Sequence, residues 1–372
     1  MSNVPPSLLQ SVAKSFDLYG SYESGAPYGT GHINDTFAVV FDQAGTPVRY
    51  IMQRVNQNVF KNAPALMDNI RRVTEHQNRK LREAGTPRAS RRALTLIHSR
   101  DGAPFVRDGD GGLWRMYLFI EGATGHDIIE TPAQAEAAAR AFGMFQGLLT
   151  DLPGAPLHET IPDFHHTGSR FAALQRAIEA DTHNRAADVQ DEIKFALERE
   201  ADTSVLIEHQ AAGRIPTVVT HNDTKLNNVL LDDHTGEGVC VIDLDTIMPG
   251  LALYDFGDMV RTATNSAAED EQNLALVEMR MSIFEALARG YLSTAGLFLN
   301  QLEKELLPFA GKLLTFECGI RFLTDHLQGD SYFKIHRPNH NLDRCRNQFK
   351  LVKSIEEQLD NMQSLCQQVA VS

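Results

Sequence analysis

A short polar segment between two apolar runs carries the residue types best suited to chemistry. It reads THNDTKLNN over residues 220–228 and holds His221, Asp223 and Asn228 in an H-x-D-x-x-x-x-N pattern. Asp243 follows inside a second apolar run, VCVIDLD. In phosphoryl transfer, one carboxylate orients the attacking hydroxyl and accepts its proton, while an amide oxygen and a second carboxylate hold Mg²⁺ against the phosphates. Asp223 suits the first role, and Asn228 and Asp243 suit the second.

A polar hairpin loop with Asp and Asn in turn positions is the alternative interpretation of this segment. Asp243 favours the catalytic one, because a carboxylate among β-branched and apolar residues is costly to bury without a partner such as a metal ion. Asp245 is either a second metal ligand or a residue that hydrogen-bonds the following loop. Asn227 adjoins Asn228, so the choice of asparagine depends on the five-residue step from Asp223.

A Gly-x-Gly turn, Gly29 and Gly31, precedes the first strand pattern. Such a turn lets backbone amides approach phosphate oxygens, although a plain hairpin has the same composition. The next strand should carry the lysine that pairs the α- and β-phosphates in kinases. It reads YIMQRV and offers Gln53 and Arg54 instead. Either Gln53 hydrogen-bonds the phosphates as a neutral group, or Arg54 turns inward, or Mg²⁺ does more of the work.

The periodicity of the chain predicts the elements that must position these residues. Up to residue 120, short β-patterned runs surround one long helical pattern, which favours an antiparallel sheet with one main helix. These runs are 36–41, 49–55, 94–96 and 114–120, and the helical pattern is 63–84. Beyond residue 121 helical patterns dominate, at 132–149, 169–180, 190–208, 269–295, 301–327 and 344–369. We therefore predict an α+β fold with an N-terminal lobe built on the sheet over 1–120 and a larger, mostly helical lobe over 121–372.

Composition limits the partners and the compartment. The 372 residues contain 35 Lys and Arg against 48 Asp and Glu, and the net charge of −13 argues against nucleic acid and anionic membranes. There is no apolar run of about 18 residues, which a membrane span requires. The four scattered cysteines indicate reduced, mostly buried thiols rather than a disulfide framework. We expect a cytoplasmic protein that is a monomer or a weak homodimer.

Several long strings resemble the aminoglycoside phosphotransferase and choline kinase superfamily, and most closely its N-acetylhexosamine 1-kinases. They are PYGTGHINDTF (27–37), VTHNDTKLNN (219–228), IDLDTIMPG (242–250), YDFGDMVR (254–261) and ECGIRFLTDHLQGDSYF (317–333). The resemblance implies a bilobal protein-kinase-like fold. It also implies transfer of the ATP γ-phosphoryl, with Mg²⁺, to the anomeric hydroxyl of N-acetylglucosamine or N-acetylgalactosamine.

The resemblance also implies residue roles. Asp223 matches the family's catalytic base, and Asn228 and Asp243 match its metal ligands. Arg321 and Tyr332 lie in the segment that contacts the sugar, and His32 lies in the glycine-rich loop. An equal alternative for Arg321 is an ion pair with Asp325, one helical turn away, instead of a contact with the sugar. An equal alternative for Tyr332 is a structural place in the core or at the rim.

Two further segments are interpreted through the kinase-like fold. Glu121, after the strand pattern 114–120, belongs to the hinge whose backbone groups face adenine. Asp255 begins a D-F-G sequence, the metal motif of protein kinases, but it lies twelve positions after Asp243 (255 − 243 = 12). We therefore predict that this D-F-G belongs to a structural or sugar-side loop.

Two alternatives to an N-acetylhexosamine kinase stay open. One is a kinase of another hydroxyl, on an aminoglycoside, choline, homoserine or another sugar; the other is a nucleotide-binding scaffold without turnover, which the missing lysine permits. A cationic substrate should meet a cluster of carboxylates late in the chain. Acidic and basic residues instead alternate over 317–345, which favours a neutral polyol.

Overall fold

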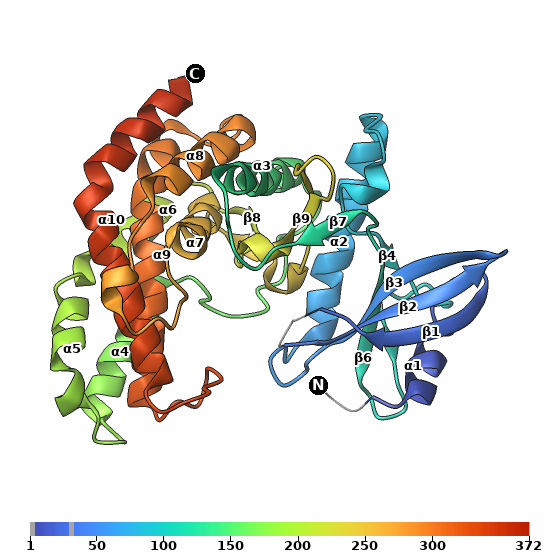
Figure 1. The fold of residues 1–372 in the computed structure, drawn as a ribbon, viewed down its shortest axis with the longest axis horizontal. Coiled ribbons are helices and arrows are strands. Elements are labelled where there is room, and N and C mark those ends of the chain that lie inside the picture. The colour runs from blue at the N-terminus through green and yellow to red at the C-terminus, as the bar shows by residue number, and fades with distance from the viewer. Residues whose placement is uncertain (1–3, 30–32, 372) are drawn as a thin grey trace. The chain divides into compact units, whose positions relative to one another are not determined.

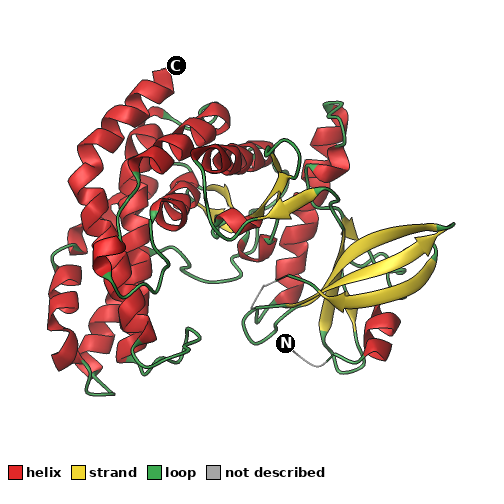
Figure 2. Cartoon of the chain, viewed as in Figure 1, coloured by secondary structure: helices red, strands yellow, loops and turns green. Residues whose placement is uncertain are grey.

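The computed structural model describes residues 4–29 and 33–371, which form two compact units of discontinuous sequence. Unit 1 contains the chain up to residue 124 together with 151–161 and 239–248. Unit 2 contains 125–150, 162–238 and the chain from 249 onward. Unit 1 carries an antiparallel sheet and unit 2 is mostly helical (Figures 1 and 2), so the predicted α+β fold class is confirmed. The division into lobes at residue 120 stays a prediction.

Unit 1 is built on one antiparallel sheet in the strand order β1-β2-β3-β6-β4, with β5 also paired to β6. Its strands are β1 (Ser21–Pro27), β2 (Asp35–Gln43), β3 (Thr46–Arg54), β4 (Leu96–Ile97), β5 (Val106–Arg107) and β6 (Leu113–Leu118). Its helices are α1 (Pro6–Ala13) and α2 (Ala63–Glu83). The long strands and α2 were predicted from periodicity within three residues at each end, but α1 and β1 were not predicted.

The missed elements α1 and β1 lack the usual sequence signals. β1 is an edge strand without a buried residue, so it shows no alternation of apolar and polar side chains. α1 has only eight residues, and its apolar face packs on one face of the sheet. That core contains Leu9, Val12, Phe16, Phe37, Val39, Phe41, Met52, Trp114 and Met116.

Unit 2 contains the long helices of the C-terminal part of the chain (Figure 1). They are α3 (Pro132–Leu149), α4 (Thr167–Ala180), α5 (Gln190–Leu197), α6 (Val205–Ala211), α7 (Ala252–Thr264), α8 (Met281–Ala295), α9 (Gln301–Leu327) and α10 (His340–Val371). The short strands after β6 are β7 (Ala123–Gly125), β8 (Val218–Thr220), β9 (Val229–Asp232), β10 (Gly238–Val241) and β11 (Met248–Gly250). A core of aromatic and aliphatic residues joins α4, α5, α9 and α10.

Helix caps explain where the prediction was accurate. α3 and α9 have the predicted bounds, and each begins with a capping box, Thr131 with Gln134 and Asn300 with Glu303. The helix predicted over 269–295 is wrong in its first part, since α8 begins at Met281. The pattern over 190–208 is divided into α5, a 3-10 turn and the start of α6.

Helix α7 was predicted as a loop, and this prediction is wrong. Twelve of its 13 residues are buried. The helical periodicity is present in the sequence, with Asp255, Asp258 and Thr262 at three- and four-residue steps. The helix was missed because the D-F-G sequence was interpreted through the loop motif of protein kinases. Gly257 lowers the helical propensity. It also allows close packing, because a Cβ there would lie 2.5 Å from the carbonyl oxygen of Ala310 in α9.

The apolar length of the helices and the state of the cysteines can both be compared with the sequence predictions. None of the helices in the described part of the chain is long and apolar enough to cross a membrane. The cysteines are free, with Cys240, Cys345 and Cys366 buried and Cys318 half-buried, as the sequence predicted. Burial raises the pKa of Cys240 and of Cys366 to about 12, and that of Cys318 to about 11.

We predict that Gly290→Ala destabilises unit 2. A Cβ at Gly290 in α8 would overlap the backbone carbonyl of Glu136 in α3, and a backbone group can move only with its whole helix. The expected loss of unfolding free energy is about 1–3 kcal/mol, measured by urea denaturation. Gly147→Ala in α3 is the control: the nearest atom to its Cβ lies at 3.6 Å. This change should stabilise by about 0.5–1 kcal/mol, and equal effects of the two substitutions would contradict the packing.

Candidate active site

The predicted catalytic loop connects β8 to β9 in unit 2. Asp223 is 27% exposed, and Asn222 before it has a left-handed backbone (φ 65°), which asparagine tolerates better than most residues. The amide nitrogen of Asn228 donates to the backbone carbonyl of Asp223 at 2.8 Å and to its Oδ2 at 3.2 Å. Asn227 is exposed and donates to Asp127 instead (3.3 Å). The five-residue step thus places Asn228, and not Asn227, beside the predicted base.

His221 holds the start of this loop in the core. It is fully buried and packs edge-on against Phe142 and Phe145 of α3, at ring distances of 5.5 and 5.8 Å. Its Nδ1 accepts a hydrogen bond from the backbone N–H of Asp223 (3.3 Å). The histidine of the motif therefore orients the backbone that carries the carboxylate.

Asp255 of α7 holds the backbone at the start of this loop. Its two oxygens accept the N–H groups of His221 (2.9 Å) and Asn222 (2.7 Å), and Gln146 donates to Oδ2 at 2.6 Å. Complete burial raises the pKa of Asp255, against the opposing effect of His221 and of these hydrogen bonds. The D-F-G aspartate thus has a structural contact, as predicted, although it lies on a helix rather than on a loop.

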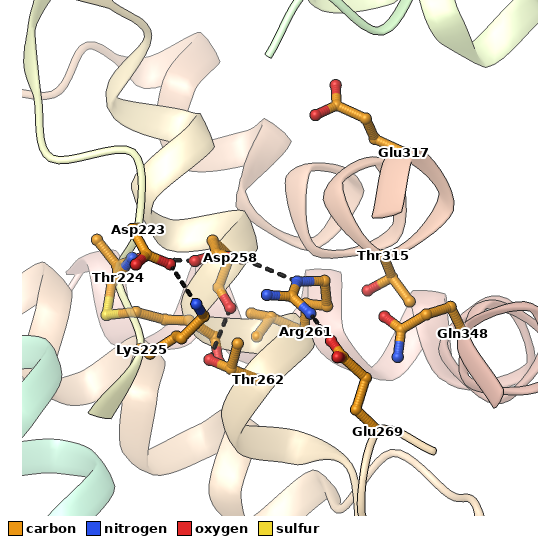
Figure 3. A network of polar contacts seen from close by, with 12 residues as sticks. Asp223, Thr224, Lys225, Asp258, Arg261, Thr262, Glu269, Thr315, Glu317 and Gln348 are labelled. Atoms are coloured by element: carbon orange, nitrogen blue, oxygen red, sulfur yellow. Dashed lines mark hydrogen bonds and ion pairs between the residues drawn. The ribbon is translucent and has the colours of Figure 1, made fainter. Parts of the chain in front are cut away.

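Asp258, one turn further along α7, is a second carboxylate that holds the backbone of the loop (Figure 3). Asp258 accepts from the N–H of Thr224 (2.9 Å) and from Nε of Arg261 (2.8 Å), and Arg261 reaches Glu269 at 2.8 Å. Burial alone would raise the pKa of Asp258, but Arg261 and the other cations nearby lower it. The sequence showed Asp258 and Arg261 near the D-F-G, but not that they lie beneath the catalytic loop.

Lys225 is the cation closest to the predicted base, and sequence reasoning missed it. Its Nζ lies 2.8 Å from Oδ1 of Asp223, and its side chain is 46% exposed. The charge of Asp223 raises the pKa of Lys225. An ammonium therefore stands next to the carboxylate at the surface of the loop. The Asp-x-Lys spacing was the only signal in the sequence.

A buried ion pair connects the loop to α9. His165 Nδ1 lies 2.7 Å from Oε1 of Glu317, and its Nε2 lies 3.1 Å from the carbonyl oxygen of Asn222. Both ring nitrogens face acceptors, so both must donate, which requires the protonated ring. Burial lowers the pKa of His165, but Glu317 outweighs it and the net shift is upward. In Glu317 burial raises the pKa, and His165 reverses this to a net lowering.

Arg321 lies one turn beyond Glu317 on α9. Its guanidinium lies over the rings of Phe164 (5.4 Å) and Phe333 (5.6 Å), and within the described residues it has no hydrogen bond or ion pair. The alternative of an ion pair with Asp325 is wrong. Asp325 instead accepts the backbone N–H groups of Ser331, Tyr332 and Phe333 and the amide of Asn341, so both its oxygens are used to build the loop after α9.

Two neighbours of Arg321 complete this surface. Tyr332 is 70% exposed and touches Phe333 edge-on (4.8 Å), so it lies at the rim rather than in the core. Arg170 of α4 donates to the carbonyl oxygen of Phe164 at 3.0 and 3.2 Å. Burial first, and then the positive charge of Arg321, lower the pKa of Arg170. Two half-buried guanidinium groups of unit 2 therefore contact Phe164, Arg321 at its ring and Arg170 at its backbone carbonyl.

The residues predicted to bind nucleotide belong to unit 1. Gly29 has φ 76°, and the space around its Cα is open, so backbone could approach a ligand there. Gly31 and His32 lie outside the described residues. Gln53 bonds to Thr36 (3.0 Å) and accepts from Arg115 (2.9 Å). The side chain of Glu121 pairs with Arg49, and its carbonyl oxygen accepts from Arg91 at 2.8 Å.

The sequence predicted that Asp243 is the buried carboxylate of this segment, but the structure buries Asp245 instead. Asp243 ends the apolar run in a left-handed conformation (φ 58°) with its side chain exposed, whereas Asp245 is buried. The cost of burying a carboxylate therefore concerns Asp245, which Arg115 neutralises. Left-handed backbone in a non-glycine residue is strained and often found at functional sites.

The two predicted metal ligands, Asn228 in unit 2 and Asp243 in unit 1, each present an oxygen atom. Asn228 turns its amide nitrogen to Asp223, which leaves the amide oxygen as a donor for a ligand, and Asp243 offers an exposed carboxylate. Both are the hard oxygen ligands that Mg²⁺ prefers. Within the described ranges no group of three or more His, Cys, Asp or Glu could hold a metal ion by itself.

The fold and the loop define a kinase-like phosphotransferase, and comparison with known proteins identifies the family. A model of the phosphotransferase enzyme family matches residues 24–294. The chain therefore belongs to this family of phosphotransferases.

Solved structures confirm the protein-kinase-like fold. An aminoglycoside phosphotransferase from Alicyclobacillus acidocaldarius has a TM-score of 0.61 at 15% identity, covering 100% of this chain and 98% of that one. A spectinomycin phosphotransferase bound to ADP and spectinomycin gives 0.53 at 12% identity, with coverage of 100% and 99%. A choline kinase from Cryptosporidium parvum gives 0.53 at 14% identity, with coverage of 96% and 97%.

We predict that the coupling between His165 and Glu317 depends on pH. The raised pKa of His165 contributes stability that is complete below its ordinary value of 6.5 and is lost as pH rises through the folded pKa. The lowered pKa of Glu317 contributes stability above its ordinary value of 4.5 that is lost as pH falls through the folded pKa. A double-mutant cycle with His165→Gln and Glu317→Gln should give about 1–3 kcal/mol near pH 6 and less at pH 9. A coupling that is constant between these pH values would contradict the ion pair.

Proposed function

We propose that the protein transfers the γ-phosphoryl group of ATP to the anomeric C1 hydroxyl of an N-acetylhexosamine, N-acetylglucosamine or N-acetylgalactosamine. The observation that carries this proposal is the surface formed by Arg321, Arg170, Phe164 and Phe333, which is connected to the catalytic loop through Glu317 and His165. Aromatic rings pack against the apolar face of a sugar, and guanidinium groups donate hydrogen bonds to hydroxyl or N-acetyl oxygens.

The roles within the loop follow from its contacts. Asp223 orients the C1 hydroxyl and accepts its proton, since its backbone is held by His221 and Asp255 and its carboxylate stays accessible. Asn228 and Asp243 would hold Mg²⁺, which neutralises charge on the phosphates when bound. Lys225 adds a positive charge beside Asp223, where negative charge of the transferred group accumulates. His32, Gly29, Gly31, Gln53, Glu121 and Tyr332 keep their predicted contacts with sugar or nucleotide as part of this proposal.

The charges near the acceptor surface argue against a cationic substrate. Every carboxylate of the segment 317–345 already has partners in the chain: Glu317 with His165, Asp325 with backbone N–H groups, Asp330 with Arg185, and Asp343 with Arg337. Arg321 has no hydrogen bond or ion pair to a carboxylate among the described residues, although its positive charge helps to lower the pKa of Glu317. Aminoglycosides, choline and ethanolamine carry positive charge and would be repelled by this pair of arginines. A neutral acceptor with carbonyl and hydroxyl oxygens fits better.

We predict that Asp223→Asn lowers kcat by about 10²–10⁴-fold, because the amide cannot accept the hydroxyl proton. The KM values should change little, since the amide keeps the size of the side chain. Sugar 1-phosphate formation, with the position of the phosphate read by ³¹P NMR, measures the effect. Asp233→Asn at an exposed turn is the matched control and should retain full activity. Turnover by Asp223→Asn at the wild-type rate would remove Asp223 from the reaction.

We also predict that Arg321→Met raises the KM for N-acetylglucosamine about 10- to 100-fold and leaves the KM for ATP unchanged. A hydrogen bond to a charged group contributes about 1.5–3 kcal/mol, which corresponds to this range. Arg176→Met, an exposed arginine of α4, is the control. Choline and kanamycin should give no product, and glucosamine should react poorly because its amine is cationic. Product from choline or kanamycin but not from hexosamines would replace the proposal by another small-molecule kinase, and nucleotide binding without any product would indicate a scaffold.

A further inference from the structure

The cation that kinases usually carry on β3 is present in unit 1, but on the neighbouring strand. Gln53 occupies the position on β3 where a lysine is expected, and in the antiparallel pairing of β3 with β6 its direct partner is Arg115. Nε of Arg115 donates to Oε1 of Gln53 at 2.9 Å. The side chain of Arg115 is only 1% exposed, so this guanidinium is a buried charge in the middle of the sheet.

The buried charge is neutralised by the segment that carries the predicted metal ligand. Nη1 of Arg115 forms an ion pair with Oδ1 of Asp245, two residues after Asp243. Burial would lower the pKa of Arg115, but Asp245 first, and then Tyr117 and Asp243, outweigh it and the net shift is upward. A buried arginine is tolerated only when it is paired and hydrogen-bonded in this way.

Asp245 also connects to the glycine-rich segment. Its Oδ2 accepts from the amide of Asn34 at 2.5 Å, and Oδ1 of Asn34 accepts the backbone N–H of Asn56 at 2.9 Å, just after β3. Asp245 thus has both oxygens engaged within unit 1. Of the two roles left open by the sequence, this arrangement favours a hydrogen-bonding residue over a second metal ligand.

Arg54, the other candidate for the missing cation, is engaged elsewhere. Its Nη2 lies 3.5 Å from Oδ2 of Asp108, a residue of the hairpin between β5 and β6, and its guanidinium lies 5.8 Å from the ring centre of Trp114. Asp108 also accepts from the indole N–H of Trp114 and from the N–H of Gly112, both at 2.8 Å. Arg54 therefore stabilises this hairpin and is not directed at Asp245.

We propose that Arg115 is a positioning residue that replaces the missing β3 lysine. By holding Asp245 it fixes two parts that must bind MgATP together: the strand end that presents Asp243, and the end of the glycine-rich segment at Asn34. The proposal depends on the nucleotide- and metal-binding roles proposed above. It does not depend on the identity of the sugar. It accounts for a kinase that lacks the lysine and still binds its nucleotide.

The test is nucleotide binding by the full-length protein, measured by isothermal titration calorimetry with ATP in Mg²⁺ and with ATP in EDTA. Arg115→Met should weaken MgATP binding at least tenfold and reduce the ratio between the affinities with and without Mg²⁺. Arg115→Lys should recover part of this affinity, because a lysine can pair with Asp245 but cannot also reach Gln53. The KM for the sugar should be unchanged. Arg54→Met is the matched control; it should lower the melting temperature and leave MgATP affinity within about twofold.

Asn34→Ala keeps the test decisive where Arg115→Met fails to fold. It removes the bonds of the Asn34 side chain to Asp245 and to the backbone N–H of Asn56 but leaves the pair of Arg115 and Asp245 intact. It should weaken MgATP binding about three- to tenfold. Wild-type affinity in a folded Arg115→Met protein, or in both Arg115→Lys and Asn34→Ala, would overturn the role of Arg115. Failure of the wild-type protein to bind MgATP would instead overturn the proposed function, so the two failures are distinguishable.

Discussion

The arrangement of the catalytic loop depends on one buried carboxylate, that of Asp255. Two consecutive backbone N–H groups, of His221 and Asn222, point at its oxygens, and the left-handed turn at Asn222 makes this possible. An unpaired backbone N–H in the core costs about 1–3 kcal/mol, so the aspartate and the turn stabilise each other. The position of Asp223 follows, because the next peptide leaves this turn toward the surface. α7 is fully buried for the same reason: it must present Asp255 and Asp258 beneath the loop.

Pairing of charges, rather than their number, determines which substrates the protein suits. The excess of acidic residues suggests a cationic ligand when it is counted along the chain. In the structure the buried carboxylates of unit 2 are occupied by backbone amides, His165 and Arg261, and the group without a partner near the loop is a guanidinium. These carboxylates therefore have structural partners within unit 2.

The sequence predicted the fold class, the main strands and the long capped helices, because amphipathic periodicity and capping residues are local signals. It also selected Asn228 over Asn227 by spacing alone. It did not predict α7, because the D-F-G sequence was interpreted as a loop motif, or β1, which buries no side chain. Nor could it predict that Arg115 faces Gln53, that His165 reaches Glu317, or that Asp245 rather than Asp243 is buried. These contacts join residues more than 60 positions apart or depend on the exact end of a strand, and no pattern along the chain encodes them.

The burial of the cysteines has a practical consequence. Thiolate is the form that reacts with alkylating and oxidising reagents, and the raised pKa values of Cys240, Cys318 and Cys366 leave almost none of it at neutral pH. Cys345 is buried and its pKa is raised as well. The cysteines of the native protein should therefore react slowly with maleimides. A single cysteine introduced at an exposed position of either unit can then carry a fluorophore or spin label without removal of the natural thiols.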